Sequence, residues 1–120
     1  MFVDDELDFR EMLDLMMKKE GYETETAEDG SDFLNKLDTF DPDLVTLDVM
    51  MPGLTTNEIL EKLRGTKSKP KIILLTVVRY SEEEQKKIFE MGNIVDYIVK
   101  PFEIDDFMDS IKKHVVMLFL

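Results

Sequence analysis

Leu44-Val45-Thr46-Leu47-Asp48 is an apolar run of strand length that ends in a carboxylate. A turn signal, Asp41-Pro42-Asp43, precedes it, and the loop Met50-Met51-Pro52-Gly53 follows one residue later. Short apolar runs bounded by turn residues are typical of buried strands. The pattern predicts a strand over residues 44–48 that carries Asp48 at its carboxyl end.

Three other apolar runs also end in polar residues. They are residues 1–3, followed by Asp4 and Asp5, residues 72–75, followed by Thr76, and residues 97–99, followed by Lys100. In a parallel sheet the carboxyl ends of the strands meet at one edge, where ligands bind at the point of strand-order reversal. We therefore expect these acids, the hydroxyl and the ammonium to converge.

Helical periodicity fills the segments between the runs. Apolar residues at three- and four-residue spacing predict helices over residues 9–20, 31–40, 55–63, 81–91 and 104–115. Two of them begin with capping boxes, Thr55 with Glu58 and Ser81 with Glu84. The remaining strands are predicted at residues 22–27, 71–76 and 96–99. Five strands alternating with five helices predict one α/β domain over residues 1–120, a doubly wound parallel sheet covered on both faces.

Composition excludes several classes of function. The net charge of −12 disfavours direct binding to nucleic acid, and the chain has no cysteine for thiol chemistry or thiolate metal sites. Its single histidine, His114, falls late in a predicted helix, which argues against imidazole catalysis. With no signal-like N-terminus and no long apolar tract, the expectation is a soluble cytoplasmic protein that binds no membrane and has protein partners.

Three converging carboxylates repel one another unless a cation joins them or one stays protonated. Oxygen ligands without imidazole or thiolate indicate Mg²⁺. A carboxylate next to Mg²⁺ and a lysine is a workable nucleophile toward phosphorus, which would give an aspartyl phosphate. The expected chemistry is therefore phosphoryl transfer.

The chain resembles the receiver domain of two-component response regulators over nearly its whole length. The matching pieces are residues 3–6, 21–22, 27–30, 42–48, 51–53, 75–76 and 97–102. This resemblance implies a flavodoxin-like fold with strand order 2-1-3-4-5. It also implies that a histidine kinase or phosphotransfer protein donates a phosphoryl group to the domain. A downstream protein or a fused output domain would receive the signal.

The resemblance assigns roles by position. Asp48 resembles the phosphoacceptor, which takes the phosphoryl group and loses it only slowly. Asp5, Asp48 and the backbone carbonyl of Met50 would hold Mg²⁺, with Asp4 acting largely through water. The remaining roles go to Thr76 as the switch threonine, Lys100 as the phosphate-pairing lysine, which precedes a cis proline bond, and Tyr97 as the switch aromatic. The surface of the fourth helix, fifth strand and fifth helix would then change shape.

Each of these residues also has an ordinary structural reading. Asp4 and Asp5 suit a helix start, Asp48 and Thr76 suit turns or caps, Lys100 suits a solvated surface and Tyr97 suits a core. The functional reading rests on their joint placement at strand ends.

Three departures from the family pattern affect the expectations. Thr55-Thr56 stands where an Asp-Gly pair is usual, and the loss of a glycine's conformational freedom is expected to change how that loop closes on Mg²⁺. Val77 follows the switch threonine where a small residue is usual, which predicts slow gain and slow loss of phosphate. One extra residue between Gly92 and Tyr97 predicts a bulge or an altered turn. These departures keep open an alternative, a receiver-like interaction module that no longer uses phosphate.

A third hypothesis, the second alternative, is a small Mg²⁺ phosphohydrolase. It is disfavoured because Met50 stands where such enzymes place a second aspartate, so we do not expect a turnover enzyme. The apolar residues 115–120 suggest either packing back on the sheet or a homodimer contact.

Overall fold

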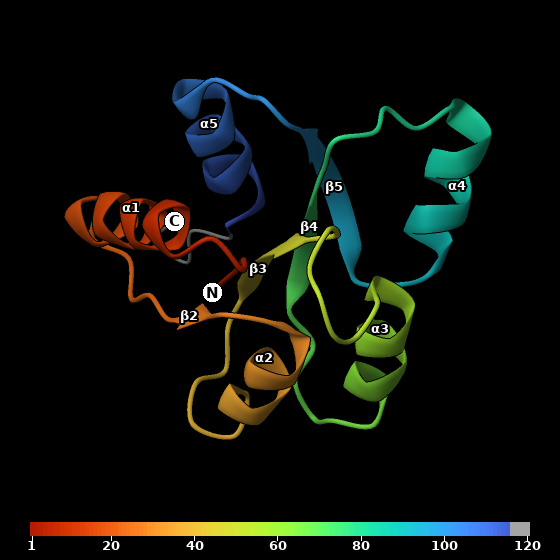
Figure 1. The fold of residues 1–120 in the computed structure, drawn as a ribbon, viewed down its shortest axis with the longest axis horizontal. Helices are drawn as coiled ribbons and strands as arrows, with labels where there is room; N and C mark the ends of the chain where they lie inside the picture. The colour runs from red at the N-terminus through yellow and green to blue at the C-terminus, as the bar shows by residue number, and fades with distance from the viewer. Residues whose placement is uncertain (116–120) are drawn as a thin grey trace, which may run out of the picture.

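The computed structural model describes residues 1–115 of the 120-residue chain. It contains one five-stranded parallel sheet in the order β2-β1-β3-β4-β5 (Figure 1). The strands are β1 (Phe2–Val3), β2 (Thr26–Ala27), β3 (Leu44–Asp48), β4 (Lys71–Thr76) and β5 (Ile94–Val99). The predicted doubly wound fold and strand order are confirmed.

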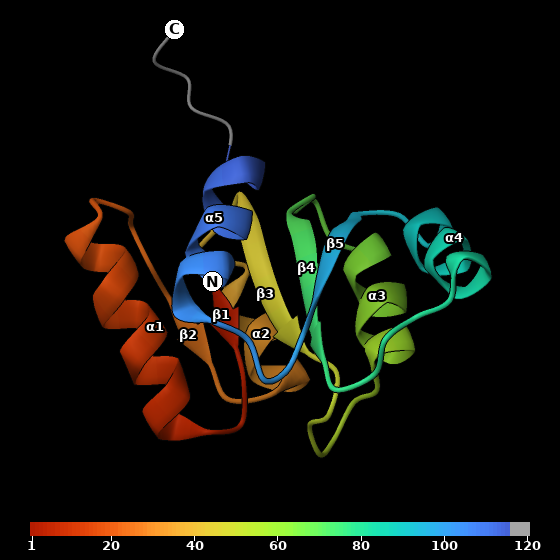
Figure 2. The same ribbon diagram turned by 90° about the horizontal axis from the view of Figure 1, so that it is seen from above.

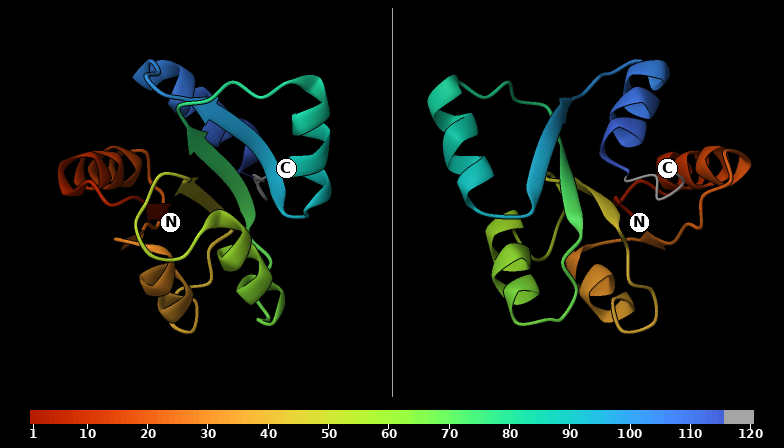
Figure 3. Two further views of the ribbon diagram at one scale, coloured as in Figure 1. Left: turned by 45° about the vertical axis from the view of Figure 1, so that its right-hand side comes forward. Right: turned by 180° about the vertical axis from the view of Figure 1, so that it is seen from behind.

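Five helices alternate with the strands: α1 (Leu7–Lys19), α2 (Gly30–Lys36), α3 (Thr56–Arg64), α4 (Glu82–Glu90) and α5 (Ile104–His114). Helices α1 and α5 lie on one face of the sheet, while α2, α3 and α4 lie on the other (Figure 1; Figure 3). Two buried clusters correspond to these faces. Phe107 and Leu13 belong to the first, and Phe33 and Ile59 to the second. No helix within residues 1–115 combines the length and apolarity needed to cross a bilayer.

The helix starts follow the local sequence signals. Thr55 and Ser81 each cap a helix and complete a capping box with Glu58 and Glu84, as predicted. Asp29 caps α2 by accepting a hydrogen bond from the backbone N–H of Asp32 at 2.8 Å. Although Thr55-Thr56 stands where an Asp-Gly pair is usual, the start of α3 is therefore fully capped.

Strand β2 is shorter than predicted. The expected strand over residues 22–27 is reduced to Thr26–Ala27. The cause lies in the neighbouring strand, because β1 has only two residues and on this side pairs with Thr26 and Ala27 alone. Upstream of Thr26 the Glu25 carbonyl oxygen still accepts a hydrogen bond from the Phe2 N–H at 3.0 Å, but β1 offers no residue for the pairing to continue. The prediction was therefore wrong in its extent.

The extra residue before Tyr97 is accommodated as a bulge. Ile72 pairs with Ile94 but Ile73 pairs with Asp96, which leaves Val95 without a partner in the ladder. Two residues opposing one is the defining feature of a β-bulge. The predicted bulge is confirmed, and β5 begins at Ile94, two residues earlier than expected.

The bulge restores the register before the end of β5. Thr76 pairs with Val99, so Lys100 continues from the strand next to Thr76. The Lys100 backbone N–H donates to the Thr76 carbonyl oxygen at 2.7 Å. Figure 2 shows the loops that follow β1, β3, β4 and β5 gathered along one edge of the sheet. Of residues 115–120, for which packing on the sheet or a homodimer contact was expected, only Val115 is described, and it packs against the cluster that contains Phe107.

Candidate functional site

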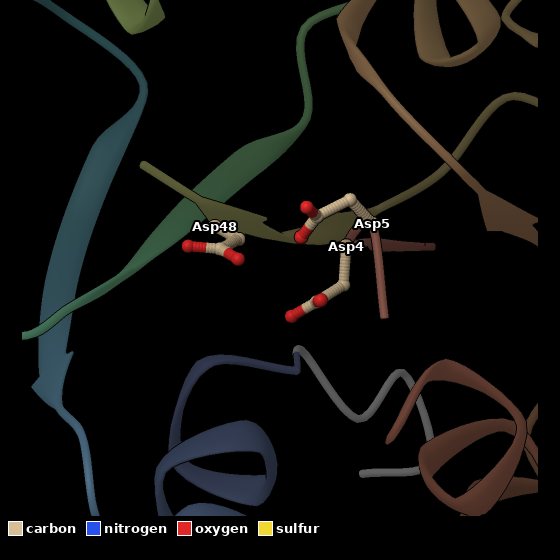
Figure 4. Close-up of side chains that lie close together, drawn as sticks. All are labelled: Asp4, Asp5 and Asp48. Carbon is tan, nitrogen blue, oxygen red and sulfur yellow. The ribbon is translucent and has the colours of Figure 1, made fainter. Parts of the chain in front are cut away.

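Three carboxylates converge at the carboxyl edge of the sheet (Figure 4). Asp4 and Asp5 follow β1, and Asp48 is the last residue of β3. One oxygen from each of the three carboxylates lies within 4.8 Å of the others. Asp4 and Asp48 are only 1% and 5% exposed, whereas Asp5 is exposed to solvent.

The parallel pairing of β1 and β3 creates this arrangement. Val3 pairs with Leu47, so the next residue of each strand, Asp4 or Asp48, reaches the same level of the edge. The short apolar run Phe2–Val3 anchors β1 because both side chains are buried. Burial of the strands thus forces two acids close together with little water to screen them.

Asp4 is held by its own turn. Its Oδ1 accepts the backbone N–H of Glu6 at 2.9 Å, and its carbonyl oxygen accepts a hydrogen bond from Arg10 at 2.6 Å. Burial raises the pKa of the Asp4 carboxyl, the Glu6 N–H and Lys100 oppose that rise, and the negative charge of Asp48 adds to it. A cation bound here would favour the ionised form of Asp4.

Asp48 is fixed by the loop that follows it. Its Oδ1 accepts the backbone N–H of Met50 at 2.9 Å. The loop is held in turn by the Val49 N–H, which donates to the carbonyl oxygen of Leu75 on β4 at 3.0 Å. Met50 therefore lies next to the carboxylate, and the metal-binding role of its carbonyl oxygen stays a prediction.

Lys100 brings a positive charge into the site from β5. Its Nζ atom is 3.4 Å from Oδ2 of Asp4 and 3.4 Å from Oδ2 of Asp48. The Lys100-Pro101 peptide bond is cis, as expected. The lysine side chain is 23% exposed, so it keeps some contact with water.

Thr76 lies at the same edge, at the end of β4. It is 1% exposed, and its Oγ1 accepts the backbone N–H of Val78 at 3.1 Å. The Tyr80 hydroxyl donates to the same oxygen at 3.5 Å, a long hydrogen bond. A small movement of Thr76 would therefore change the contacts of Tyr80.

Tyr97 connects to Thr76 through Tyr80. The two tyrosine rings meet edge to face with centroids 4.9 Å apart and an interplanar angle of 63°. The Tyr97 hydroxyl also accepts a hydrogen bond from Gln85 of α4 at 3.3 Å. Sequence reasoning missed Tyr80, whose only signal was an aromatic residue four positions after Thr76.

Exposed apolar side chains stand on the loops around the acids. Met50 follows Asp48 and is 67% exposed, while Val77 and Val78 follow Thr76 and are 59% and 51% exposed. Val77 therefore projects from the site's rim into solvent and is not packed in the core. His114, which the sequence did not favour as a catalytic residue, lies at the far end of α5, where its Nε2 is 3.0 Å from Oδ2 of Asp96.

The donor set fits Mg²⁺. Three carboxylates offer hard oxygen ligands, and the single positive charge of Lys100 does not balance them. The exposure of Asp5 leaves one side of the cluster open to water, which Mg²⁺ usually retains in its coordination shell. The cluster is thus suited to a hydrated divalent cation that also accepts oxygens from a phosphorylated ligand.

The chain is similar to known proteins over most of its length. The family model described as response regulator receiver domain matches residues 1–112. Sporulation initiation phosphotransferase F of Bacillus subtilis is 32% identical over 114 residues, which cover 95% of this chain and 90% of that protein.

Solved structures show the same architecture. Response regulator protein TrrA of Thermotoga maritima, in complex with Mg²⁺-BeF, is 36% identical with a TM-score of 0.75, over 95% of this chain and 96% of that chain. Chemotaxis protein CheY4 of Vibrio cholerae is 28% identical with a TM-score of 0.78, over 95% of both chains.

Proposed function

Because this chain belongs to the family of response regulator receiver domains of two-component systems, we propose that Asp48 is its phosphoacceptor. The donor is a phosphohistidine on a histidine kinase or a phosphotransfer protein. The observation that carries the proposal is the position of Asp48, at the end of β3 between the acidic pair and the Lys100 ammonium. The complex of TrrA with Mg²⁺-BeF supports it by similarity.

In the transfer, a carboxylate oxygen of Asp48 attacks phosphorus. The new bond joins phosphorus to that oxygen, and the bond between phosphorus and the imidazole nitrogen of the donor breaks. The electron pair of the broken bond stays on the imidazole nitrogen, and one proton taken up from solvent by the imidazole ring makes the departing histidine neutral. The product on this chain is one aspartyl phosphate.

The residues around Asp48 stabilise the charge that develops. Lys100 places its ammonium 3.4 Å from Oδ2 of Asp48 and thus within reach of a phosphoryl oxygen. Thr76 offers a hydroxyl at the end of the neighbouring strand. Asp4, Asp5 and Asp48, with the Met50 carbonyl, would hold Mg²⁺, which offsets negative charge on the transferring group when bound.

The switch follows from the tyrosine contacts. When Thr76 turns toward the phosphoryl group, it leaves the hydroxyl of Tyr80 without its partner. Tyr80 packs against Tyr97, and Tyr97 is tied to α4 through Gln85, so the change reaches the surface of α4, β5 and α5. Such a switch shifts populations between two packings.

The partners in this proposal are proteins. The donor meets the edge around Asp48, and a downstream protein or a fused output domain reads the surface of α4, β5 and α5. The net charge of −12 disfavours direct binding of this domain to nucleic acid. The domain is modified once per cycle and loses the phosphoryl group slowly, so it is not a turnover enzyme.

A phosphodonor experiment tests the proposal. The protein is incubated with acetyl phosphate and Mg²⁺, and its intact mass is recorded over time. We expect the mass of one phosphoryl group to be added to wild type and to Asp43→Asn, a control at the exposed opposite end of β3. Asp48→Asn and a sample with excess EDTA should stay unmodified.

Two results would contradict the proposal. Absence of modification in wild type would favour the interaction module that does not use phosphate. Continuous release of inorganic phosphate at enzymatic rates would favour a phosphohydrolase.

A further inference from the structure

The ammonium of Lys100 has a third neighbour besides the two carboxylates. Its Nζ atom is 5.1 Å from the centroid of the Phe9 ring, in α1. Cations within about 6 Å of a ring centroid are attracted to its negative face. The two Nζ–Oδ2 distances of 3.4 Å are longer than the roughly 2.7–2.9 Å of strong charge-assisted hydrogen bonds. The Lys100 ammonium therefore lies between two carboxylates and an aromatic ring and forms no short hydrogen bond with either carboxylate.

The Phe9 ring is itself fixed by aromatic contacts. It meets Phe102 edge to face with centroids 5.9 Å apart. Phe102 stacks on Phe107 of α5 with centroids 5.1 Å apart, and Phe107 is fully buried. Phe102 also follows Lys100 by only two residues. The position of the ring is thus determined by the packing of α1 against α5.

We propose that Phe9 is a positioning residue that holds the Lys100 ammonium next to Asp48 for the incoming phosphoryl group. This inference rests on the proposed function, since it concerns the same transfer. Without the ring, the ammonium loses one of its three neighbours. The side chain is already partly exposed, so it would turn into water more often.

The position of Lys100 has opposite consequences before and after phosphoryl binding. Before it, the ammonium neutralises Asp4 and Asp48 and so competes with a divalent cation for their oxygens. After it, the ammonium pairs with the added phosphoryl oxygens. Loss of the Phe9 ring should therefore strengthen binding of Mg²⁺ alone and weaken binding of a phosphoryl analogue.

A purely structural role of Phe9 predicts something different. If the ring only packed α1 against α5, its loss would loosen the whole edge and weaken both ligands, or neither. Affinity changes of opposite sign for Mg²⁺ and for the phosphoryl analogue would therefore distinguish a positioning role of Phe9 from a packing role.

The test measures two affinities by calorimetry. Mg²⁺ is titrated into metal-free protein, and beryllofluoride is titrated into protein saturated with Mg²⁺. The variants are Phe9→Leu, Phe9→Tyr, and position 9 carrying 3,4,5-trifluorophenylalanine, which keeps the ring shape but removes its negative face. Phe33→Leu is the matched control, because Phe33 is fully buried in the cluster on the other face of the sheet.

For Phe9→Leu and for the trifluorinated ring we expect Mg²⁺ to bind more tightly and beryllofluoride more weakly, each by roughly three- to tenfold. Phe9→Tyr should keep both wild-type affinities. Phe33→Leu should not produce opposite shifts. The trifluorinated variant preserves the test if Phe9→Leu fails to fold.

Three outcomes would overturn the inference. Shifts of the same sign for both ligands would assign Phe9 to packing, and wild-type affinities in the trifluorinated variant would exclude the cation–π contact. If wild type itself binds no beryllofluoride, the proposed function fails and takes this inference with it.

Discussion

The Nζ atom of Lys100 lies 3.4 Å from Oδ2 of Asp48, although the two residues are 52 positions apart in the chain. The contact depends on the order of the strands, since β4 lies between the strands that carry them. It also depends on the bulge at Val95, which corrects the register before β5 ends. The contact thus depends on a feature of the fold far from the acids.

Replacing Lys100 tests its two roles together. Lys100→Ala should slow phosphorylation by acetyl phosphate by about 100-fold, because a preorganised charge is lost. The same change should tighten Mg²⁺ binding, because the carboxylates lose a competing cation. Rates from mass spectrometry and affinities from calorimetry measure the two effects. Lys112→Ala removes only an exposed ion pair with Glu20 and should change neither.

Val77 should control access to Asp48 from the rim. Its branched side chain is 59% exposed on the loop after Thr76. We expect Val77→Ala to speed both the gain of phosphate from acetyl phosphate and its loss severalfold, since a smaller side chain admits donor and water. Val78→Ala, at the next position of the same loop, is the comparison. Unchanged rates of phosphate gain and loss in Val77→Ala would show that Val77 does not control access to Asp48.

Tyr80 should carry the signal from Thr76 to Tyr97. The chain has three tyrosines and no tryptophan, so a variant with Tyr22→Phe and Tyr80→Leu leaves Tyr97 as the only emitter. In this variant beryllofluoride should still bind, but the emission of Tyr97 should no longer respond. Loss of the aromatic pair should also cost about 1 kcal/mol of stability in urea unfolding.

The control keeps both switch tyrosines. In Tyr22→Phe alone, beryllofluoride binding should change the tyrosine emission. An equal response after Tyr80 is replaced would mean that Thr76 and Tyr97 communicate by another route.

Much of this site could be predicted from the sequence, because local patterns determine where strands end. The run that ends at Asp48 was enough to predict the edge of the sheet. The extra residue before Tyr97, recognised against the spacing usual in the resembling family, left a bulge and an altered turn as the two expectations. The roles of Asp48 and Lys100 stay predictions until they are measured.

Other features could not be predicted from the sequence, because they depend on contacts between side chains that are distant in the chain. The Phe9 ring reaches Lys100 only through the packing of α1 against α5, and no spacing in the sequence encodes that distance. The shortness of β2 likewise depends on β1, which offers only two residues for pairing. Tyr80 was missed because an aromatic residue near the start of a helix has many ordinary uses.

The pH dependence of the unfolding free energy should show that the ionised form of Asp4 destabilises the metal-free fold. Because burial raises its pKa above the ordinary 3.8, the stability that its protonated form contributes is complete below pH 3.8 and is lost as the pH rises through the folded-state pKa. Asp4→Asn stays neutral at every pH. It should therefore be more stable than metal-free wild type at neutral pH, with a difference that shrinks in acid.

Urea unfolding in excess EDTA at a series of pH values measures this difference. Asp38→Asn, which alters an exposed acid in the turn after α2, should show no comparable trend. The burial argument would be contradicted if Asp4→Asn raised the free energy of unfolding equally at every pH, or lowered it at neutral pH. Added Mg²⁺ should stabilise wild type more than Asp4→Asn, because ligand binding favours the folded state.

The most direct measurement of the central claim is the location of the phosphoryl group. Protein treated with acetyl phosphate and Mg²⁺ is reduced with borohydride, which traps an aspartyl phosphate, and the peptides are sequenced by tandem mass spectrometry. The account predicts a single reduced residue at Asp48, and none when Mg²⁺ is withheld. Modification at another residue, or at several acids alike, would contradict it.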